Sequence, residues 1–357
     1  MGSYEQNYRS TQNIVNAANA VIKHNQAQIQ KDVWTDNGEG NKIHIVRSGT
    51  DSEEATMIAG SIFETKLNYQ LDNSKFAVLY RTNAQSRSLE EALIKKNIPY
   101  VIYGGLSFYK RKEIKNVLAY FRLTINNFDE ESLLRVINYP QRGIGATTID
   151  KLKVAASEQN TRLWNLVEDP DAFGLDINTS TKLKLKDFAT RIKSFSATVP
   201  TSDAYSLGKH IVNSTGIWQD LKEDVTEKER LDNVESLLDS MKEFIEKEPE
   251  AEFDEDTGEL ITEYFPSLDR FMTGIALLTD EESKEDGSHD KVKLMTIHSA
   301  KGLEFDYVYV SGLEENLFPS SLSLGSRAEL EEERRLFYVA VPRRKKMLTL
   351  THAQNRY

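Results

Sequence analysis

Apolar residues follow two different patterns along this chain, continuous runs and a helical repeat. The segments Phe76–Tyr80 and Tyr307–Val310 are almost continuously apolar, which is typical of strands that are buried on both faces of a parallel sheet. Between residues 11 and 24, apolar side chains instead recur every three or four positions, which predicts an amphipathic helix. The same reasoning predicts further strands at 43–46 and 100–103 and further helices at 51–67 and 84–96. This alternation predicts an α/β fold, with a parallel sheet and helices on both of its faces.

The alternation of strands and helices stops after Tyr103 and resumes at Val292. Helical patterns fill the interval, at 113–125, 132–137, 148–157, 203–215 and 228–246. We therefore expect a discontinuous α/β domain that carries an inserted, mostly α-helical domain. The expected boundaries are 1–106 and 289–357 for the α/β domain and 107–288 for the insert. The return to the α/β domain, at 281–288, is polar and charged enough to be a linker.

Composition narrows the possible classes of protein. The 357 residues are 39% hydrophobic, which is enough to fill two cores. There is no cysteine, so neither a disulfide framework nor a thiolate metal site is possible, and the six histidines show no metal-ligand spacing. The sequence has no basic and then apolar leader, and no apolar run of about 18 residues that could span a bilayer. We therefore expect a cytoplasmic protein with no metal site of its own and no membrane partner.

The net charge of −11 argues against extensive contact with nucleic-acid phosphates, which bind lysine and arginine. The charge is unevenly distributed, however. Acidic residues gather between 246 and 260, whereas basic residues gather between 110 and 115. The acidic balance makes nucleic-acid binding less expected without excluding it.

Two segments near the C-terminus carry the most informative chemistry. Residues 296–305, TIHSAKGLEF, place an imidazole, an ammonium and a carboxylate just before a buried strand, and polar groups at strand ends of α/β sheets are usually functional. Residues 331–346, EEERRLFYVAVPRRKK, form an acidic and then basic helical segment that leads to a second short strand at 347–350. Together the two segments resemble motifs V and VI of the superfamily 1 DNA helicases of the UvrD, Rep and PcrA type.

Further segments are similar to blocks of the same family, in the family's order. Residues 6–14 resemble motif IV, and the others are 79–87, 104–115 and 140–147. The sequence contains no Gly-x-x-x-x-Gly-Lys-Ser/Thr phosphate loop and none of the Asp-Glu motor motifs of the family's first RecA-like domain. The resemblance therefore implies the C-terminal half of a helicase, cut just before motif IV, with a discontinuous RecA-like domain and an inserted helical domain.

The resemblance also implies a nucleotide-binding role for four residues. Tyr8 would stack on adenine, Arg9 would reach the γ-phosphate, and Glu304 would accept hydrogen bonds from the ribose. Arg343 would act as the arginine finger, so that Arg343 and Arg9 are the expected catalytic residues. Where the family has Ile-Thr-Arg-Ala-Lys, this chain has residues 341–345, VPRRK, and the proline leaves either Arg343 or Arg344 at the finger position.

The DNA-binding residues implied by the resemblance fall into three groups. The first group, in motif V, would contact single-stranded DNA. The second group lies where the chain first passes from the α/β domain into the insert, and it combines aromatic stacking with positive charge. The alternative for this second group is that it packs at a hinge. A Gly-x-Gly loop in the insert would bring its backbone N–H groups to duplex DNA, with a plain turn as the alternative. The three groups are, in order, Thr296, His298, Ser299 and Lys301; Phe108, Lys110 and Arg111; and Arg142, Gly143, Gly145 and Thr147. Ser320 stands where the family often has histidine, which weakens one further expected contact.

These features lead to one preferred interpretation and two alternatives. The preferred one is the C-terminal part of an ATP-dependent DNA translocase, with 3′-to-5′ polarity implied by the family alone. It would use ATP with Mg²⁺, whose ligands lie outside this chain, so the fragment alone is not expected to hydrolyse ATP. Its expected partners are single-stranded and duplex DNA, the missing N-terminal RecA-like half and repair proteins. The alternatives are the helicase part of a recombination helicase-nuclease and a non-catalytic DNA-binding module.

Overall fold

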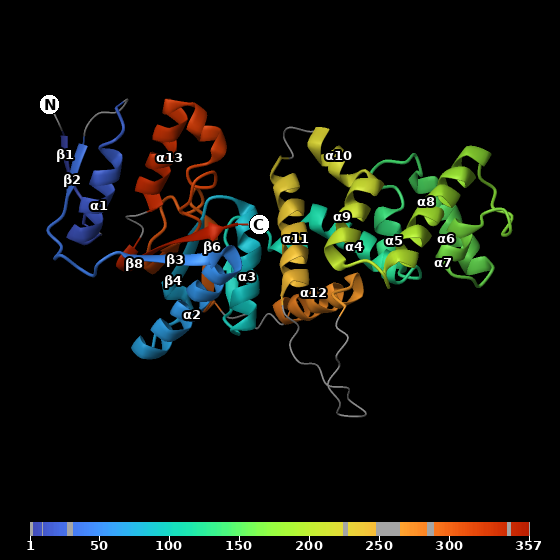
Figure 1. Cartoon of the computed structure of the whole chain (residues 1–357), viewed down its shortest axis with the longest axis horizontal. Helices are drawn as coiled ribbons and strands as arrows, with labels where there is room; N and C mark the ends of the chain where they lie inside the picture. The colour runs from blue at the N-terminus through green and yellow to red at the C-terminus, as the bar shows by residue number, and fades with distance from the viewer. Residues whose placement is uncertain are drawn as a thin grey trace. The chain divides into compact units, whose positions relative to one another are not determined.

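The computed structural model describes residues 3–8, 10–26, 31–223, 228–247, 265–283, 289–340 and 344–356. The chain divides into two compact units. Unit 1 comprises Met1–Phe108 and Glu281–Tyr357, and unit 2 comprises Tyr109–Asp280. Figure 1 shows both units, with the chain coloured from blue at the N-terminus to red at the C-terminus. The exact domain boundaries expected from the sequence stay a prediction.

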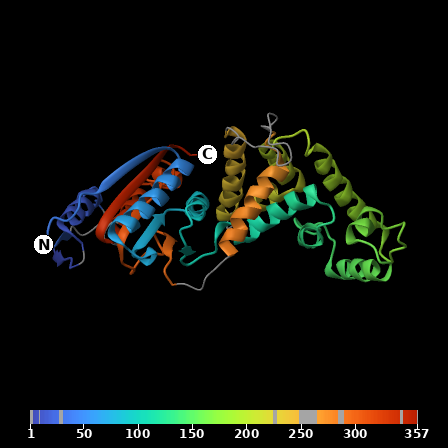
Figure 2. The same ribbon diagram turned by 90° about the horizontal axis from the view of Figure 1, so that it is seen from below.

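Unit 1 is built on a six-stranded parallel sheet with the strand order β3-β8-β7-β4-β6-β5. Strands from the two parts of unit 1 are interleaved in it, so that blue β3 lies beside red β8 (Figures 1 and 2). The strands are β3 (His44–Thr50), β4 (Phe76–Tyr80), β5 (Tyr100–Ile102), β6 (Val292–Thr296), β7 (Phe305–Val310) and β8 (Arg344–Asn355). This sheet confirms the predicted α/β class. A separate pair of parallel strands, β1 (Ser3–Gln6) and β2 (Lys31–Trp34), precedes it.

Helices cover both faces of the large sheet. Because successive side chains of a strand point to opposite faces, Val78 and Tyr80 of β4 pack with α2 (Asp51–Tyr69) and α3 (Ser86–Lys95). Ala77 and Leu79 instead pack with the group that includes α1 (Gln12–Ile22) and the end of α13 (Arg327–Ala340). All five residues of β4 are buried, which explains why its sequence is uninterrupted by polar residues.

Unit 2 is helical in the part that the structure describes. Among its described helices, α4 (Lys112–Ile125) has the most buried residues, ten, and the neighbouring helices pack around it. Helices α5, α8 and α9 are capped at their N-termini by Asp129, Asn178 and Asp203, whose side chains accept a hydrogen bond from a backbone N–H of the first turn. The helices are α4 (Lys112–Ile125), α5 (Glu130–Val136), α6 (Ala146–Glu158), α7 (Leu163–Glu168), α8 (Thr179–Thr198), α9 (Ala204–Thr215), α10 (Ile217–Glu223), α11 (Lys228–Glu246) and α12 (Leu268–Ser283).

None of the helices in the described ranges is long and apolar enough to cross a membrane. Those ranges also contain no group of three or more His, Cys, Asp and Glu side chains that could hold a metal ion.

Candidate functional site

The polar loops of unit 1 gather at the carboxyl ends of its central strands. Thr296, at the end of β6, pairs with Tyr80 at the end of β4, and Val310 at the end of β7 pairs with Leu79. Because these strands are parallel, the loops that follow them start at one edge of the sheet. This edge is where α/β proteins usually bind their ligands.

In the loop after β6, two apolar residues are buried and two polar residues between and after them face solvent. Ile297 and Ala300 are fully buried, whereas His298 and Lys301 are exposed. The hydroxyls of Thr296 and Ser299 lie 2.9 Å apart, and the Thr296 hydroxyl also accepts a hydrogen bond from the backbone N–H of Ser299. The structure therefore brings the four predicted motif V residues together on one short loop, of which two side chains are hydrogen-bonded to each other and two face solvent.

The loop after β5 reaches the same place. Gly104 has a positive φ of 79°, and a Cβ atom added there would lie 3.4 Å from the hydroxyl of Ser299. A Cβ atom there would be in van der Waals contact with the motif V loop, so the main cost of a larger residue would be the strain of its own backbone.

An ion pair joins the loop after β4 to α13. The guanidinium of Arg81 donates through Nη2 and Nε to the carboxylate of Glu333, and the shorter distance, to Oε1, is 2.8 Å. The Glu333 side chain is almost entirely buried. Partial desolvation and the charge of Arg81 lower the pKa of His298, while Glu333 and Glu332 act in the opposite direction. Arg81, Glu333 and His298 therefore form one electrostatic group, which sequence reasoning did not identify.

Gln85 fixes the loop after β4 against the loop after β7. Its Oε1 accepts hydrogen bonds from the backbone N–H groups of Arg81 and Thr82, both at 2.9 Å. A Cβ atom on Gly312, which has a φ of 75°, would lie 2.2 Å from Nε2 of Gln85. The absence of a side chain at Gly312 is therefore what allows the two loops to meet.

A second buried charge network lies at the ends of β7 and β8. Oε1 of Glu54, in the first turn of α2, accepts hydrogen bonds from the Gly312 N–H at 2.9 Å and from the Thr351 hydroxyl. Its Oε2 accepts from Arg356 at 2.7 Å, and Arg356 also donates to Glu314. Glu54 is 2% exposed, so these partners replace the water that its charge has lost. A carboxylate in a helix's first turn is too common a pattern for the sequence to have shown this network.

The two predicted nucleotide-binding residues that the structure describes, Tyr8 and Glu304, lie elsewhere in unit 1. Tyr8 is 77% exposed in the segment before α1, and Glu304 is half-buried just before β7. In the parallel register Phe305 pairs with Arg344, so Glu304 lies at the amino ends of β7 and β8. Arg9 and Arg343 lie outside the described residues, so their predicted roles stay predictions.

Two residues that follow α1, Asn25 and Gln26, join it to α13. Asn25 donates to the backbone carbonyl of Glu331 at 2.9 Å and accepts from Arg334 at 3.2 Å. The backbone N–H of Gln26 donates to the Glu331 carboxylate. The helix that leads towards residue 343 is thereby anchored to the helix that follows Tyr8.

The residues predicted at the first crossing differ in exposure. Phe108 is fully buried and Arg111 is 7% exposed, while Lys110 is exposed. The guanidinium of Arg111 donates to Oδ1 of Asn233 at 2.8 Å. Burial therefore favours the packing alternative for Phe108, whose ring is not available for stacking in this conformation, and the DNA contact of Lys110 stays a prediction.

The Gly-x-Gly loop of unit 2 is held by the residues around it. Oδ1 of Asn138 accepts hydrogen bonds from the backbone N–H groups of Arg142 and Ile144, and Ile144 is fully buried. Gly143 has a φ of 75°, and Gly145 and Thr147 are exposed before and at the start of α6. The guanidinium of Arg142 points inward and donates to four backbone carbonyls and a tyrosine hydroxyl. Of the four predicted residues, three thus present their surface to solvent and Arg142 does not present its charged group.

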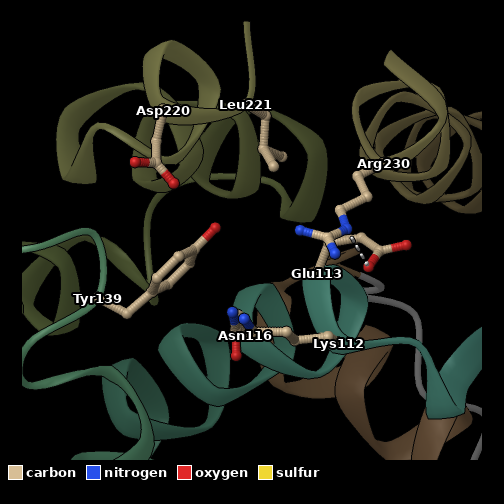
Figure 3. Close-up of a pocket in the computed structure, with 7 residues that line it drawn as sticks. All are labelled: Lys112, Glu113, Asn116, Tyr139, Asp220, Leu221 and Arg230. Atoms are coloured by element: carbon tan, nitrogen blue, oxygen red, sulfur yellow. Dashed lines mark ion pairs between the residues drawn. The ribbon is translucent and has the colours of Figure 1, made fainter. Parts of the chain in front are cut away.

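A polar pocket of about 150 Å³ lies within unit 2. Figure 3 shows the phenol of Tyr139 and the side chain of Arg230 on opposite sides of it, with residues from α4, α10 and α11. Nε of Arg230 lies 4.0 Å from Glu113, and Glu113 also accepts from Asn233 at 2.7 Å. The pocket carries charges of both signs, and none of the predicted site residues lines it.

Comparison with known proteins identifies a family for the whole chain. Residues 3–355 match the UvrD-like helicase C-terminal domain. The chain is 39% identical over 355 residues to the ATP-dependent DNA helicase PcrA of Leuconostoc citreum and 37% identical over 359 residues to that of Bacillus subtilis (strain 168). It is 36% identical over 359 residues to PcrA of Staphylococcus aureus (strain MRSA252). Each alignment covers 99% of this chain and 46% of the relative, so the chain spans about half the length of the curated relatives it matches.

Proposed function

Because the chain belongs to the UvrD-like helicase C-terminal domain family, we propose that it supplies the second motor domain and the accessory domain of an ATP-dependent DNA helicase. The observation that carries this proposal is the match over nearly the whole chain to proteins that are named ATP-dependent DNA helicases. The translocation polarity, 3′ to 5′, is part of the proposal and rests on the family resemblance.

Unit 1 is proposed to form one wall of the ATP site. The exposed ring of Tyr8 is free to stack on adenine, and Glu304 is a carboxylate that can accept hydrogen bonds from two ribose hydroxyls. Arg9 would contact the γ-phosphate, and Arg343 would stabilise the charge that spreads over the phosphoryl oxygens during transfer. ATP is proposed to bind with Mg²⁺, whose ligands and main phosphate cradle would come from the N-terminal half of the enzyme.

The carboxyl edge of the sheet is proposed to contact single-stranded DNA. The exposed His298 and Lys301 offer an imidazole and an ammonium, and Thr296 and Ser299 offer hydroxyls that can donate to phosphates. In unit 2, the exposed loop from Gly143 to Thr147 is proposed to meet the phosphates of duplex DNA. A cytoplasmic location and repair proteins as partners are also proposed, on the resemblance alone.

The proposal is tested by DNA-stimulated ATP hydrolysis. We expect no turnover by this chain alone and turnover when the N-terminal RecA-like half is supplied. In the reconstituted enzyme, Arg343→Ala should lower the turnover rate by roughly a hundredfold or more with little change in nucleotide affinity, because the contact strengthens in the transition state. Arg344→Ala is the matched control and should be nearly silent.

Two outcomes contradict the proposal. Turnover by the purified chain alone, abolished by Arg343→Ala, would show that the missing half is not needed. If Arg344→Ala abolishes turnover while Arg343→Ala does not, the finger is Arg344 and the assignment of Arg343 is wrong.

A further inference from the structure

Arg142 directly precedes the Gly143–Thr147 loop, and its guanidinium is directed into the interior of unit 2. Nη1 of Arg142 lies 2.8 Å from the carbonyl oxygen of Tyr139, and Nη2 lies 2.6 Å from the hydroxyl of Tyr120. The guanidinium carbon also lies 5.4 Å from the centre of the Phe188 ring on α8. Arg142 therefore fixes the shape of the loop, and its charged group is not directed at a ligand outside.

Lys184 of α8 brings a different cation to the same loop. A Cβ atom added to Gly143 would lie 2.6 Å from Nζ of Lys184, which is closer than van der Waals contact. The ammonium thus occupies the space that a side chain at residue 143 would fill. Phe188 lies one turn further along α8 and on the same face, so its contact with Arg142 holds Lys184 towards the loop.

Within the described part of the chain, Lys184 differs from its neighbours on α8 in having no carboxylate partner. Lys182 and Lys186 both form ion pairs with Asp171, and Lys193 forms one with Glu168. Among the residues that the structure describes, no ion pair or side-chain hydrogen bond includes Lys184. Its side chain is partly exposed, so the charge is accessible from solvent.

The surroundings of this ammonium leave room for a phosphate. Gly143, Gly145, Ala146 and Thr147 are exposed and small, while the buried Ile144 anchors the loop from beneath. A phosphate oxygen can therefore approach Nζ of Lys184 across glycine backbone, without moving a large side chain.

We propose that Lys184 is a phosphate-binding residue of the insert, which holds the backbone of duplex DNA against the Gly143–Thr147 loop. This inference rests on the proposed function, because it assumes that the loop meets DNA, and it extends the contact surface to α8. An ammonium on a flexible stem is a point charge, so the contact would add affinity without reading the base sequence.

The test measures the affinity of the full chain for a short duplex at several salt concentrations, between roughly 50 and 200 mM. Lys184→Ala should weaken binding by about fivefold at the lowest salt. It should also make the slope of log affinity against log salt shallower by about 0.9, which corresponds to the loss of one phosphate contact. Lys186→Ala, on the same helix but paired with Asp171, is the matched control and should leave the slope unchanged.

Thr147→Glu separates this inference from the proposed function. If Thr147→Glu weakens duplex binding and Lys184→Ala changes neither affinity nor slope, the role of Lys184 is refuted while the loop contact stands. If neither variant has an effect, the loop does not meet duplex DNA and both proposals fail. Equal losses for Lys184→Ala and Lys186→Ala would indicate a general charge effect and would also refute the specific contact.

Discussion

Arg81 and Glu333 lie 252 residues apart in the sequence and form a two-pronged ion pair, with the shorter N–O distance at 2.8 Å. Arg81 follows a central strand of the sheet, and Glu333 belongs to the helix that leads to the proposed arginine finger. The pair therefore ties a loop at the proposed DNA edge to the segment proposed to act on the nucleotide. Both charges act on the pKa of His298 in the motif V loop: Arg81 lowers it and Glu333 raises it.

The first prediction is that the two partners move the pKa of His298 in opposite directions. Arg81→Gln should raise this pKa and Glu333→Gln should lower it further, because each removes one opposing charge. The imidazole proton resonances, followed by NMR as the pH is changed, measure both shifts, with the other histidines as internal controls. Shifts of the same sign in the two variants would contradict the arrangement.

The lowered pKa of His298 also fixes the sign of its contribution to stability. In the unfolded chain, the imidazole takes up its proton near its ordinary pKa of 6.5, whereas the folded state takes it up only at lower pH. This group therefore makes folding less favourable as the pH falls below 6.5. His298→Gln should reduce the loss of stability over that range, as measured by urea unfolding.

The second prediction concerns the close approach at Gly312. Gly312→Ala should destabilise unit 1 more than Gly302→Ala, by about 1–3 kcal/mol. Both positions have positive φ, 75° and 91°, so both variants strain the backbone by similar amounts. Only Gly312 would place its Cβ against Gln85, since nothing lies within 4 Å of a Cβ at Gly302. Equal midpoints in denaturant for the two variants would show that Gln85 moves aside at little cost.

The third prediction concerns the buried carboxylate of Glu54. Arg356→Ala should cost about 3 kcal/mol of unfolding free energy, because it removes a charged partner from a carboxylate that is 2% exposed. Lys151→Ala in unit 2 is the control, because the ion pair of Lys151 with Asp176 is solvated and should be worth less than about 1 kcal/mol. Chemical denaturation of both variants measures the difference. Equal losses would mean that the Glu54 network is no stronger than a surface pair.

The fourth prediction follows from the burial of the Tyr120 phenol. Burial raises the pKa of this phenol from 10.0 to about 12, against the lowering effect of Arg142. The folded state thus retains a proton that the unfolded chain has lost, so stability should fall as the pH rises from 10.0 to about 12. Tyr120→Phe should remove this part of the pH dependence, measured by unfolding at alkaline pH. An unchanged profile would show that other groups cause the loss.

Much of the fold could be predicted because the relevant patterns are local. The bounds of β4 and α11 coincide with the segments predicted from apolar runs and helical spacing. Helix α8 was missed, although Leu185, Phe188 and Ile192 recur at helical spacing. Its first two turns are rich in Ser, Thr and Lys, which dilute that signal and resemble a loop.

The site was harder to predict because residue type does not determine where a long side chain points. Arg142 and Phe108 are chemically suited to DNA, yet the guanidinium of one is directed inward and the ring of the other is buried. Lys184 lies far along the chain from the loop it reaches, so only the packing of α8 reveals it. The ion pair of Arg81 with Glu333 likewise depends on strand order, which the sequence does not state.

The position of β8 between β3 and β7 has a consequence for the order in which the protein can fold as it is synthesised. The ribosome completes all of unit 2 before it makes β6, β7 and β8, so the insert can fold while the large sheet of unit 1 still lacks half of its strands. Until β8 emerges, β3 has no neighbour in the large sheet, and β4 has none until β6 and β7 emerge. The nascent chain is therefore most exposed to edge-to-edge aggregation between the completion of unit 2 and the emergence of β8, when chaperones would matter most.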